Sequence, residues 1–268
     1  MSLTASRPQT PTGVRTISET GAAADFPFFV HPDWQTDHPW LVQGITGRNG
    51  PDPFDMGLFG ATRTAAAHER WKSLRRFTGL ARAVHAHQVH GARVLRHTAG
   101  PPGLLVMDGA DGHASYETGL LMTVSVADCV PISLIATNPR CAALLHGGWR
   151  GVAAGILENG VAALHELCGV RAKDLIVHLG PAICGTCYEV GPEVHRALGT
   201  GPVDAPEPVD LRAVLARRAE AAGVEPTNIS VSAHCTRCGG LFHSHRGGAP
   251  ERQVAVLGLR AGVADSTG

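Results

Sequence analysis

The stretch LLMTVSVADCVPISLIATNPRCAALLHGGWRG, residues 120–151, decides the fold. Three apolar runs within it, at 120–126, 132–137 and 141–145, have the length and the residue types of strands. An Asn-Pro-Arg turn at 138–140 joins the second run to the third. The stretch therefore predicts three strands, with the sequence HGGWRG following the last one.

A helix is expected directly after Gly147 and Gly148, because the apolar residues that follow share one helical face. These residues are Val152, Ile156, Leu164 and Cys168. Further strands are expected at 26–30, 40–46, 174–179, 229–233 and 253–259, and further helices at 64–80, 189–198 and 211–222. Strands and helices mix without strict alternation, which predicts one α/β (α+β) domain with a mixed sheet rather than a doubly wound parallel sheet.

The composition limits the environment and the partners of the chain. Residues 1–25 are rich in small and polar residues and lack a long apolar core, so we expect a disordered N-terminal tail, without signal peptide or membrane span, before a catalytic domain at 26–262. Basic and acidic residues balance at 23 each, so neither nucleic acid nor a membrane surface is an expected partner. Seven cysteines, an odd number, in a chain of 268 residues favour a reducing cytoplasm. The oligomeric state is left open.

Three short segments place a His or a Cys at the end of, or between, apolar runs. They are Gln88-Val89-His90-Gly91, Ala127-Asp128-Cys129-Val130-Pro131 and His146-Gly147-Gly148-Trp149-Arg150-Gly151. Two imidazoles and one thiolate suit zinc, and three protein ligands leave a fourth position for water or substrate. Taken singly, each of these residues is more often a structural group. We expect Asp128 either to orient a ligand or to carry protons, or else to be an ordinary carboxylate at a strand end.

Arg150 lies where the Gly-rich turn opens a helix, a position that favours anions such as phosphate or carboxylate. The competing interpretation is a Gly-rich turn with a solvated Arg. A metal and an anion pocket side by side would suit hydrolysis or phosphorolysis.

Two Cys-x-x-Cys pairs, Cys184/Cys187 and Cys235/Cys238, have the spacing of zinc ligands within each pair. The pairs are far apart in the sequence, so reduced thiols or an adventitious redox pair are the favoured interpretation. Asp111 falls in a Gly-rich turn and could face the pocket. The carboxylates at several alternate positions and the closing Glu that a calcium loop needs are absent around it.

Five motifs in order resemble the laccase-domain family, also called the multicopper polyphenol oxidase or YfiH-like family, from about Gly44 to Leu259. They are Gln-Val-His-Gly at 88–91, Ala-Asp-Cys-Val-Pro at 127–131, His-Gly-Gly-Trp-Arg-Gly at 146–151, Gly180-Pro181 through Cys187-Tyr188-Glu189-Val190-Gly191, and Cys235-Thr236 followed by Phe242-His243-Ser244-His245-Arg246.

The resemblance implies one YfiH-like domain in which mixed β-sheets are sandwiched between helical layers. It implies a zinc site made by His90, Cys129 and His146, with Cys129, His146 and Asp128 as catalytic candidates. Family members are credited with phosphorolysis of adenosine, inosine, guanosine or methylthioadenosine, and with deamination of adenosine. Purine nucleoside and inorganic phosphate are therefore the expected partners, and Arg150 and Arg48, in Gly44-Ile45-Thr46-Gly47-Arg48, are candidates to bind phosphate.

Several alternatives keep the same residues. A copper-dependent polyphenol oxidase (laccase) would need several copper centres, commonly built from His-x-His pairs such as 85/87 and 243/245. One site of two His and one Cys could bind copper, since most sites bind Cu²⁺ more tightly than Zn²⁺, but we favour zinc and nucleosides. Cys129 activated by His146 would instead make a Cys-His hydrolase, with peptidoglycan precursors as its candidate substrates. A vestigial metal-binding module would bind zinc without turnover.

Overall fold

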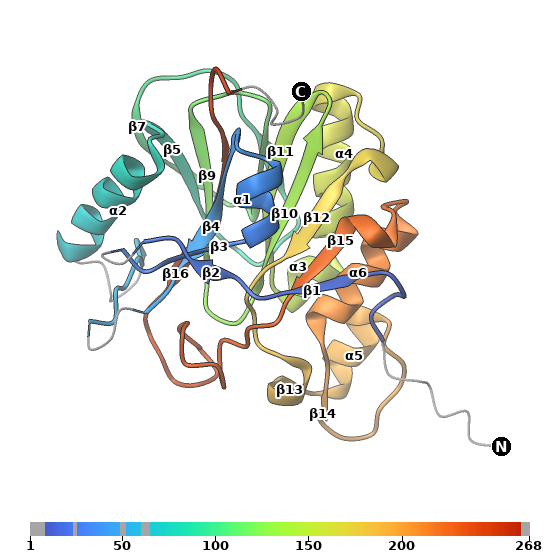
Figure 1. The fold of residues 1–268 in the computed structure, drawn as a ribbon. Helices are drawn as coiled ribbons and strands as arrows, with labels where there is room; N and C mark the ends of the chain where they lie inside the picture. The colour runs from blue at the N-terminus through green and yellow to red at the C-terminus, as the bar shows by residue number, and fades with distance from the viewer. Residues whose placement is uncertain (1–8, 24–25, 49–51, 60–64, 264–268) are drawn as a thin grey trace.

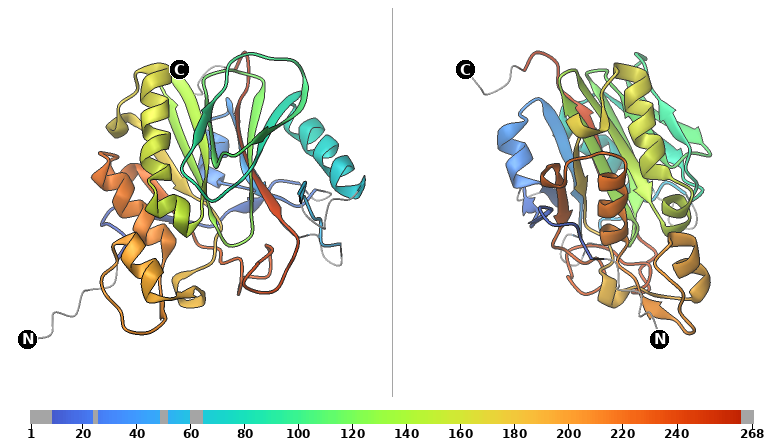
Figure 2. Two further views of the ribbon diagram at one scale, coloured as in Figure 1. Left: turned by 180° about the vertical axis from the view of Figure 1, so that it is seen from behind. Right: turned by 90° about the vertical axis from the view of Figure 1, so that its right-hand side faces the viewer.

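The computed structural model describes residues 9–23, 26–48, 52–59 and 65–263. Two seven-stranded mixed sheets pack face to face, and a two-stranded sheet lies beside them (Figure 1). The layers are visible edge-on in the right-hand view of Figure 2, with helices on the outside. The predicted single α/β (α+β) domain, with mixed sheets between helical layers, is confirmed.

The first sheet has the strand order β1-β15-β12-β10-β11-β8-β6. Its strands are β1 (Arg15–Ile17), β6 (Val94–Arg96), β8 (Gly112–Ser115), β10 (Val130–Thr137), β11 (Arg140–Gly147), β12 (Ile176–Leu179) and β15 (Ile229–Ser232). The second sheet has the order β2-β3-β4-β16-β9-β5-β7. Its strands are β2 (Thr20–Gly21), β3 (Phe28–Val30), β4 (Leu41–Thr46), β5 (Arg82–His87), β7 (Gly103–Asp108), β9 (Leu120–Val126) and β16 (Gln253–Leu259). The small sheet pairs β13 (Glu189–Val190) with β14 (Glu207–Pro208).

Helices cover the outer faces of both sheets (Figures 1 and 2). The α-helices are α1 (Pro32–Asp37), α2 (Ala65–Thr78), α3 (Trp149–Ala153), α4 (Ile156–Cys168), α5 (Pro192–Leu198) and α6 (Leu211–Ala221), and the 3₁₀ turns are η1 (Ala172–Asp174), η2 (Gly185–Cys187) and η3 (Pro226–Asn228). Apolar residues of α3 to α6 pack on the first sheet, and α2 packs on the second. Among the residues described, no helix combines the length and the apolar character needed to cross a bilayer.

The central strands are apolar on both faces because each face contributes to a different core. In β11, Ala142 and Leu144 point into the core between the sheets, while Cys141, Ala143 and Leu145 point into the core beneath the helices. Successive side chains of a strand face opposite sides of its sheet, so a strand covered on both sides needs an uninterrupted apolar run. This explains why residues 120–145 could be assigned from sequence.

The pairing of β10 with β11 positions the candidate site. The two strands form an antiparallel hairpin in which Val130 pairs with Gly147, and Pro131 pairs with His146. Cys129 immediately precedes β10, so the hairpin register brings its backbone next to the end of β11. Residues 129 and 146 are thus neighbours in space although they are distant in sequence.

Three expectations about local structure were wrong. Residues 15–17 and 20–21, expected to lie in a disordered tail, form β1 and β2, and the rest of the tail lies partly outside the described residues. The helix expected after Gly148 is split into α3 and α4 by Gly155, whose φ of 87° is left-handed. Residues 189–190, expected in a helix, pair with β14 instead. In the two strand cases, pairing with a distant segment outweighs local propensity.

Candidate metal centre

The structure brings His90, Cys129 and His146 together. His90 follows β5, Cys129 precedes β10 and His146 lies in β11. One nitrogen of each imidazole and the sulfur of Cys129 all lie within 4.8 Å of one another. The two imidazole rings are 4.9 Å apart between centroids and nearly perpendicular, at 77°. The predicted set of two nitrogens and one sulfur therefore converges on one point.

Asp111, between β7 and β8, holds two of these residues in place. Its side chain is fully buried. Oδ1 accepts hydrogen bonds from the backbone N–H of His90, at 2.9 Å, and from Nδ1 of His146, at 2.8 Å. Oδ2 accepts from the backbone N–H groups of Val89 and Gly91, at 3.1 and 2.8 Å. Because Nδ1 of His146 is engaged by the carboxylate, Nε2 is the nitrogen left to bind a metal.

The sequence pointed to Asp111 only as a turn residue that could face the pocket. A carboxylate that fixes a metal-binding imidazole is the arrangement commonly seen behind such ligands. The signal for it was a lone Asp in a Gly-rich turn, which is far more often a turn former than a partner of a ligand.

The backbone around the site is strained, and glycines allow close packing. His90 and Asp128 have positive φ angles, 58° and 91°, which are unusual for residues with a side chain and tend to cluster at functional sites. A Cβ atom on Gly148 would lie 2.9 Å from the His90 ring and 3.2 Å from the Cys129 sulfur. A Cβ atom on Gly151 would lie 2.6 Å from a backbone oxygen. Gly148 and Gly151 thus let the chain pass directly behind the ligand set.

Electrostatics favour charge separation between Cys129 and His146 in the metal-free chain. Burial disfavours the thiolate, but the charge of His146 and hydrogen bonds from both imidazoles outweigh it and lower the pKa of Cys129 to about 6. Burial likewise disfavours the imidazolium, yet the Cys129 thiolate and Asp111 raise the pKa of His146 to about 9. Cys129 is therefore readily available as a thiolate, the form that binds metals.

The residues present fit a metal ion. Two imidazole nitrogens and a thiolate are a borderline-soft donor set that suits zinc or copper. Asp111 fixes the tautomer of His146, and Gly148 keeps the space beside the ligands free of a side chain. All three donors also line one cavity, so a bound ion would be accessible to a small molecule.

This cavity has a volume of about 320 Å³. Three aromatic rings also line it. Phe59 stacks on His85, with centroids 5.9 Å apart and an angle of 18°, and lies 4.8 Å from His87. His85 is buried, and its Nδ1 forms a 2.9 Å hydrogen bond with the Thr123 hydroxyl. Burial lowers the pKa of His85 to about 4. His245 and Arg252 complete one side of the cavity wall. Sequence reasoning missed Phe59, which lies in a loop without a motif.

The other predicted residues lie outside this cavity. Asp128 accepts hydrogen bonds from the Thr236 hydroxyl, at 2.6 Å, and from the backbone N–H of Arg246, at 2.7 Å. It thereby attaches two C-terminal loops to the residue next to Cys129. Arg48 is exposed and its backbone N–H bonds to Leu241. Arg150 is exposed, with its guanidinium 4.4 Å from the centre of the Trp149 ring.

Arg150 nonetheless acts on Tyr188, a residue whose pKa also depends on Cys129. Burial and the Cys129 thiolate raise the pKa of Tyr188 to about 12, while Arg246 and Arg150 oppose that rise. The Arg246 guanidinium lies 5.3 Å from the centre of the Tyr188 ring. The pKa of Tyr188 therefore depends on two cationic side chains and on the thiolate of Cys129, a candidate metal ligand.

Comparison with known proteins places the chain in a family. Residues 48–260 match the model of the family described as multi-copper polyphenol oxidoreductase laccase. The chain is 34% identical over 248 residues to the purine nucleoside phosphorylase YlmD of Geobacillus stearothermophilus, covering 82% of this chain and 90% of that protein. It is 34% identical over 145 residues to adenosine deaminase RL5 from an unknown prokaryotic organism, covering 49% of this chain and 54% of that one.

The fold agrees with this match. The crystal structure of YlmD from Geobacillus stearothermophilus superposes with a TM-score of 0.79 and 29% identity, covering 90% of this chain and 99% of that chain. The motifs, the two-sheet fold and the match over most of the sequence all agree. This protein belongs to the multi-copper polyphenol oxidoreductase laccase family.

Proposed function

We propose that this protein is a zinc-dependent purine nucleoside phosphorylase, acting on adenosine, inosine, guanosine or methylthioadenosine, that also deaminates adenosine. The observation that carries the proposal is the convergence of His90, Cys129 and His146 at the wall of one cavity. The names of two relatives, a purine nucleoside phosphorylase and an adenosine deaminase, support the substrate class.

The cavity suits a purine nucleoside. Its volume of about 320 Å³ falls within the roughly 300–1,000 Å³ typical of small-molecule sites. The exposed ring of Phe59, backed by His85 and His87, offers a flat aromatic surface on which a base can stack. The base would then lie in the same cavity as the three metal ligands.

Zinc held by the three ligands supplies a Lewis acid beside the bound substrate. The chain's own residues do the rest. Asp111 keeps the His146 ring in one orientation. His87 and His245 line the cavity and can pass a proton to the departing base. In phosphorolysis the bond from the ribose C1′ to the base breaks, a phosphate oxygen bonds to C1′, and the base leaves with that proton.

Phosphate is expected near Arg150. Its guanidinium and that of Arg246 are the two cations whose charges act on Tyr188, and a phosphate bound there would be held by them. Arg48 remains a second candidate, next to the loop of Leu241. Replacing either predicted phosphate ligand, Arg48 or Arg150, with alanine should raise the KM for phosphate more than the KM for nucleoside.

A multicopper polyphenol oxidase is less well supported. Within the described chain, the groups of His, Cys, Asp or Glu able to hold a metal are the three-residue set and a cluster of four cysteines. Neither His-x-His pair contributes to them. His85 bonds to Thr123, and His243 is buried next to Glu251. A multicopper oxidase needs several adjoining copper centres, which this distribution of histidines does not provide.

A metal-free cysteine hydrolase is the second candidate, because one observation favours it. His146 lies between Cys129 and Asp111, the order of nucleophile, base and orienting carboxylate in a catalytic triad. Peptidoglycan precursors would be substrates of this alternative. The two candidates respond differently to metal removal and to blocking of the thiol.

The experiment that tests the proposal is incubation with adenosine and inorganic phosphate, with products separated by chromatography. Adenine and ribose 1-phosphate indicate phosphorolysis, and inosine indicates deamination. We expect adenine formation to require phosphate, to stop with a chelator and to return with zinc. Turnover that persists at full rate after complete metal removal would reject the zinc enzyme and favour the cysteine hydrolase.

A further inference from the structure

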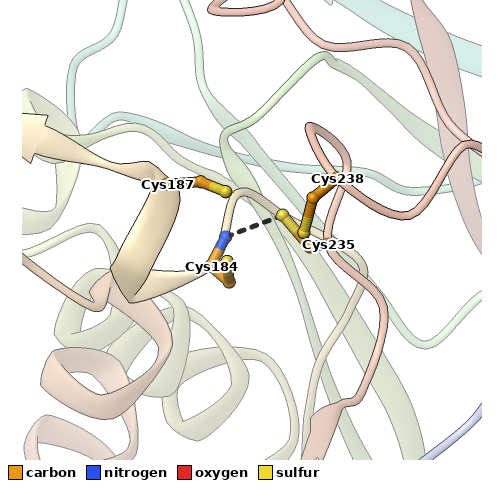
Figure 3. Close-up of side chains that lie close together, drawn as sticks. All are labelled: Cys184, Cys187, Cys235 and Cys238. Atoms are coloured by element: carbon orange, nitrogen blue, oxygen red, sulfur yellow. Dashed lines mark hydrogen bonds between the residues drawn. The ribbon is translucent and has the colours of Figure 1, made fainter.

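The two Cys-x-x-Cys pairs meet in space. Cys184 precedes η2 and Cys187 is its last residue, whereas Cys235 and Cys238 follow β15. We name these residues the four-cysteine cluster: Cys184, Cys187, Cys235 and Cys238. Their four sulfur atoms lie within 4.8 Å of one another, and all four are free thiols (Figure 3). The preference for reduced thiols or an adventitious redox pair rested on the long separation of the two pairs in sequence, but the fold brings the pairs together.

We propose that the four-cysteine cluster binds a structural zinc ion, distinct from the centre at His90, Cys129 and His146. Four thiolates fill the tetrahedral coordination of zinc and leave no position for substrate, which is the arrangement of structural sites. The Cys-x-x-Cys spacing within each pair is also that of structural zinc ligands. Neither a carboxylate nor an imidazole belongs to the cluster.

The sulfur separations fit such an ion closely. A zinc–sulfur distance of about 2.3 Å in a tetrahedron places ligand sulfurs about 3.8 Å apart. The separations in the cluster are at most 4.8 Å, so each sulfur would have to move by less than about 1 Å to reach this geometry. Small changes of side-chain torsion angles are enough, so the backbone can stay in place.

The backbone already holds the two pairs side by side. Ala182 and Cys235 form a parallel bridge, and the backbone N–H of Thr236 donates to the oxygen of Ala182 at 3.1 Å. The backbone N–H of Cys184 donates to the sulfur of Cys235 at 3.3 Å, the dashed line in Figure 3. This last contact joins the backbone of the first pair directly to a sulfur of the second pair.

A cationic side chain also lies beside the cluster. Arg237, between the two cysteines of the second pair, donates to the backbone oxygen of Cys187 at 3.0 Å. It therefore adds a positive charge beside a cluster that carries net negative charge when zinc is bound.

An ion here would tie two loops together near the first metal centre. The loop of the second pair contains Thr236, whose hydroxyl donates to Asp128, the residue before Cys129. The other loop leads into β13 and carries Tyr188. Zinc in the four-cysteine cluster would thus stabilise the folded chain and the surroundings of Asp128 without touching substrate.

The test is the metal content of the full-length chain, expressed with zinc and purified under reductant. Wild-type protein should contain one more zinc per chain than Cys238→Ser or Cys184→Ser, and should unfold at a higher temperature than either. The control Cys168→Ser, on α4 and outside the cluster, should keep the wild-type zinc content. His90→Ala should lose zinc from the other centre and keep this one.

Two results would overturn the proposal. One is equal zinc content in wild type and Cys238→Ser, and the other is a cluster that fills with iron and not zinc. If the cysteine variants do not fold, the wild-type thiols decide the question. Zinc should protect the four cluster thiols, in addition to Cys129 of the other centre, from a thiol reagent in the folded chain, and a chelator should expose them. Thiols that zinc does not protect, or that are joined in disulfides despite the reductant, would contradict a zinc site.

Discussion

Replacing Asp111 with asparagine tests whether one buried carboxylate holds the metal centre together. The side chain keeps its size but loses its charge and one acceptor oxygen. In the wild type, each carboxylate oxygen accepts two hydrogen bonds: Oδ1 from the backbone of His90 and the ring of His146, and Oδ2 from the backbone N–H groups of Val89 and Gly91. The amide of asparagine would direct its NH₂ group at one of these donor pairs.

The expected magnitude follows from that count. Two donors lose their acceptor. A fully buried donor without an acceptor costs about 1–3 kcal/mol, and the three backbone donors here are only partly buried. The free energy of unfolding should therefore fall by about 1–4 kcal/mol. Because Asp111 no longer fixes the His146 ring, zinc affinity should fall by about 10–100-fold, as for other residues that orient metal ligands.

The assay combines chemical denaturation with zinc competition against a chelator of known affinity, at a temperature at which the variant is folded. Asp174→Asn, an exposed carboxylate paired with Arg171, is the matched control and should leave zinc affinity unchanged. A folded Asp111→Asn protein that binds zinc as tightly as the wild type would refute the role given to this carboxylate.

Three further predictions concern the cavity, the ligand loop and the N-terminal segment. In steady-state assays, Phe59→Ala should raise the KM for nucleoside by about 5–150-fold, the equivalent of about 1–3 kcal/mol of base stacking. The control Phe77→Ala, in which the replaced ring is equally exposed but lies outside the cavity, should leave this KM unchanged. Gly148→Ala should lower zinc affinity in competition titrations, because its methyl carbon would lie 2.9 Å from a metal-binding ring, whereas Gly21→Ala, with open space around it, should bind zinc normally. Burial raises the pKa of Glu19, but hydrogen bonds and the charge of a buried imidazole outweigh it and lower that pKa below 4.5. A carboxyl group with a lowered pKa in the folded state stabilises the fold at pH values above its unfolded-state pKa. At neutral pH the wild type should therefore unfold at a higher denaturant concentration than Glu19→Gln, and this difference should disappear as the pH falls through the lowered pKa. A difference in unfolding midpoint that stays constant in acid would contradict the assignment.

The sequence predicted those parts of the structure that depend on local pattern. The strands at 120–126 and 132–137 and the run at 141–145 were recognisable because both of their faces are buried, which leaves an uninterrupted apolar run. The convergence of Cys129 and His146 followed from the same strands, since a short turn at 138–140 joins them into a hairpin.

Features that depend on distant contacts were not predictable in this way. The segment 15–17 is short and polar, and it becomes a strand only because it pairs with β15. Phe59 lies in a loop with no recognisable pattern, and only the fold brings it to the cavity. The two cysteine pairs were visible in the sequence, but they lie close together in space because a β-bridge joins Ala182 to Cys235. In each case the structure depends on a contact between residues that are distant in the sequence, and the local sequence around either residue does not predict that contact.

The most direct measurement is an anomalous difference map at the zinc absorption edge, from crystals of zinc-loaded, active protein. The proposed centre predicts a peak about 2.0–2.1 Å from one nitrogen each of His90 and His146 and about 2.3 Å from the sulfur of Cys129, with a coordination position open to the cavity. Fully active crystals without a peak between these three side chains would contradict it.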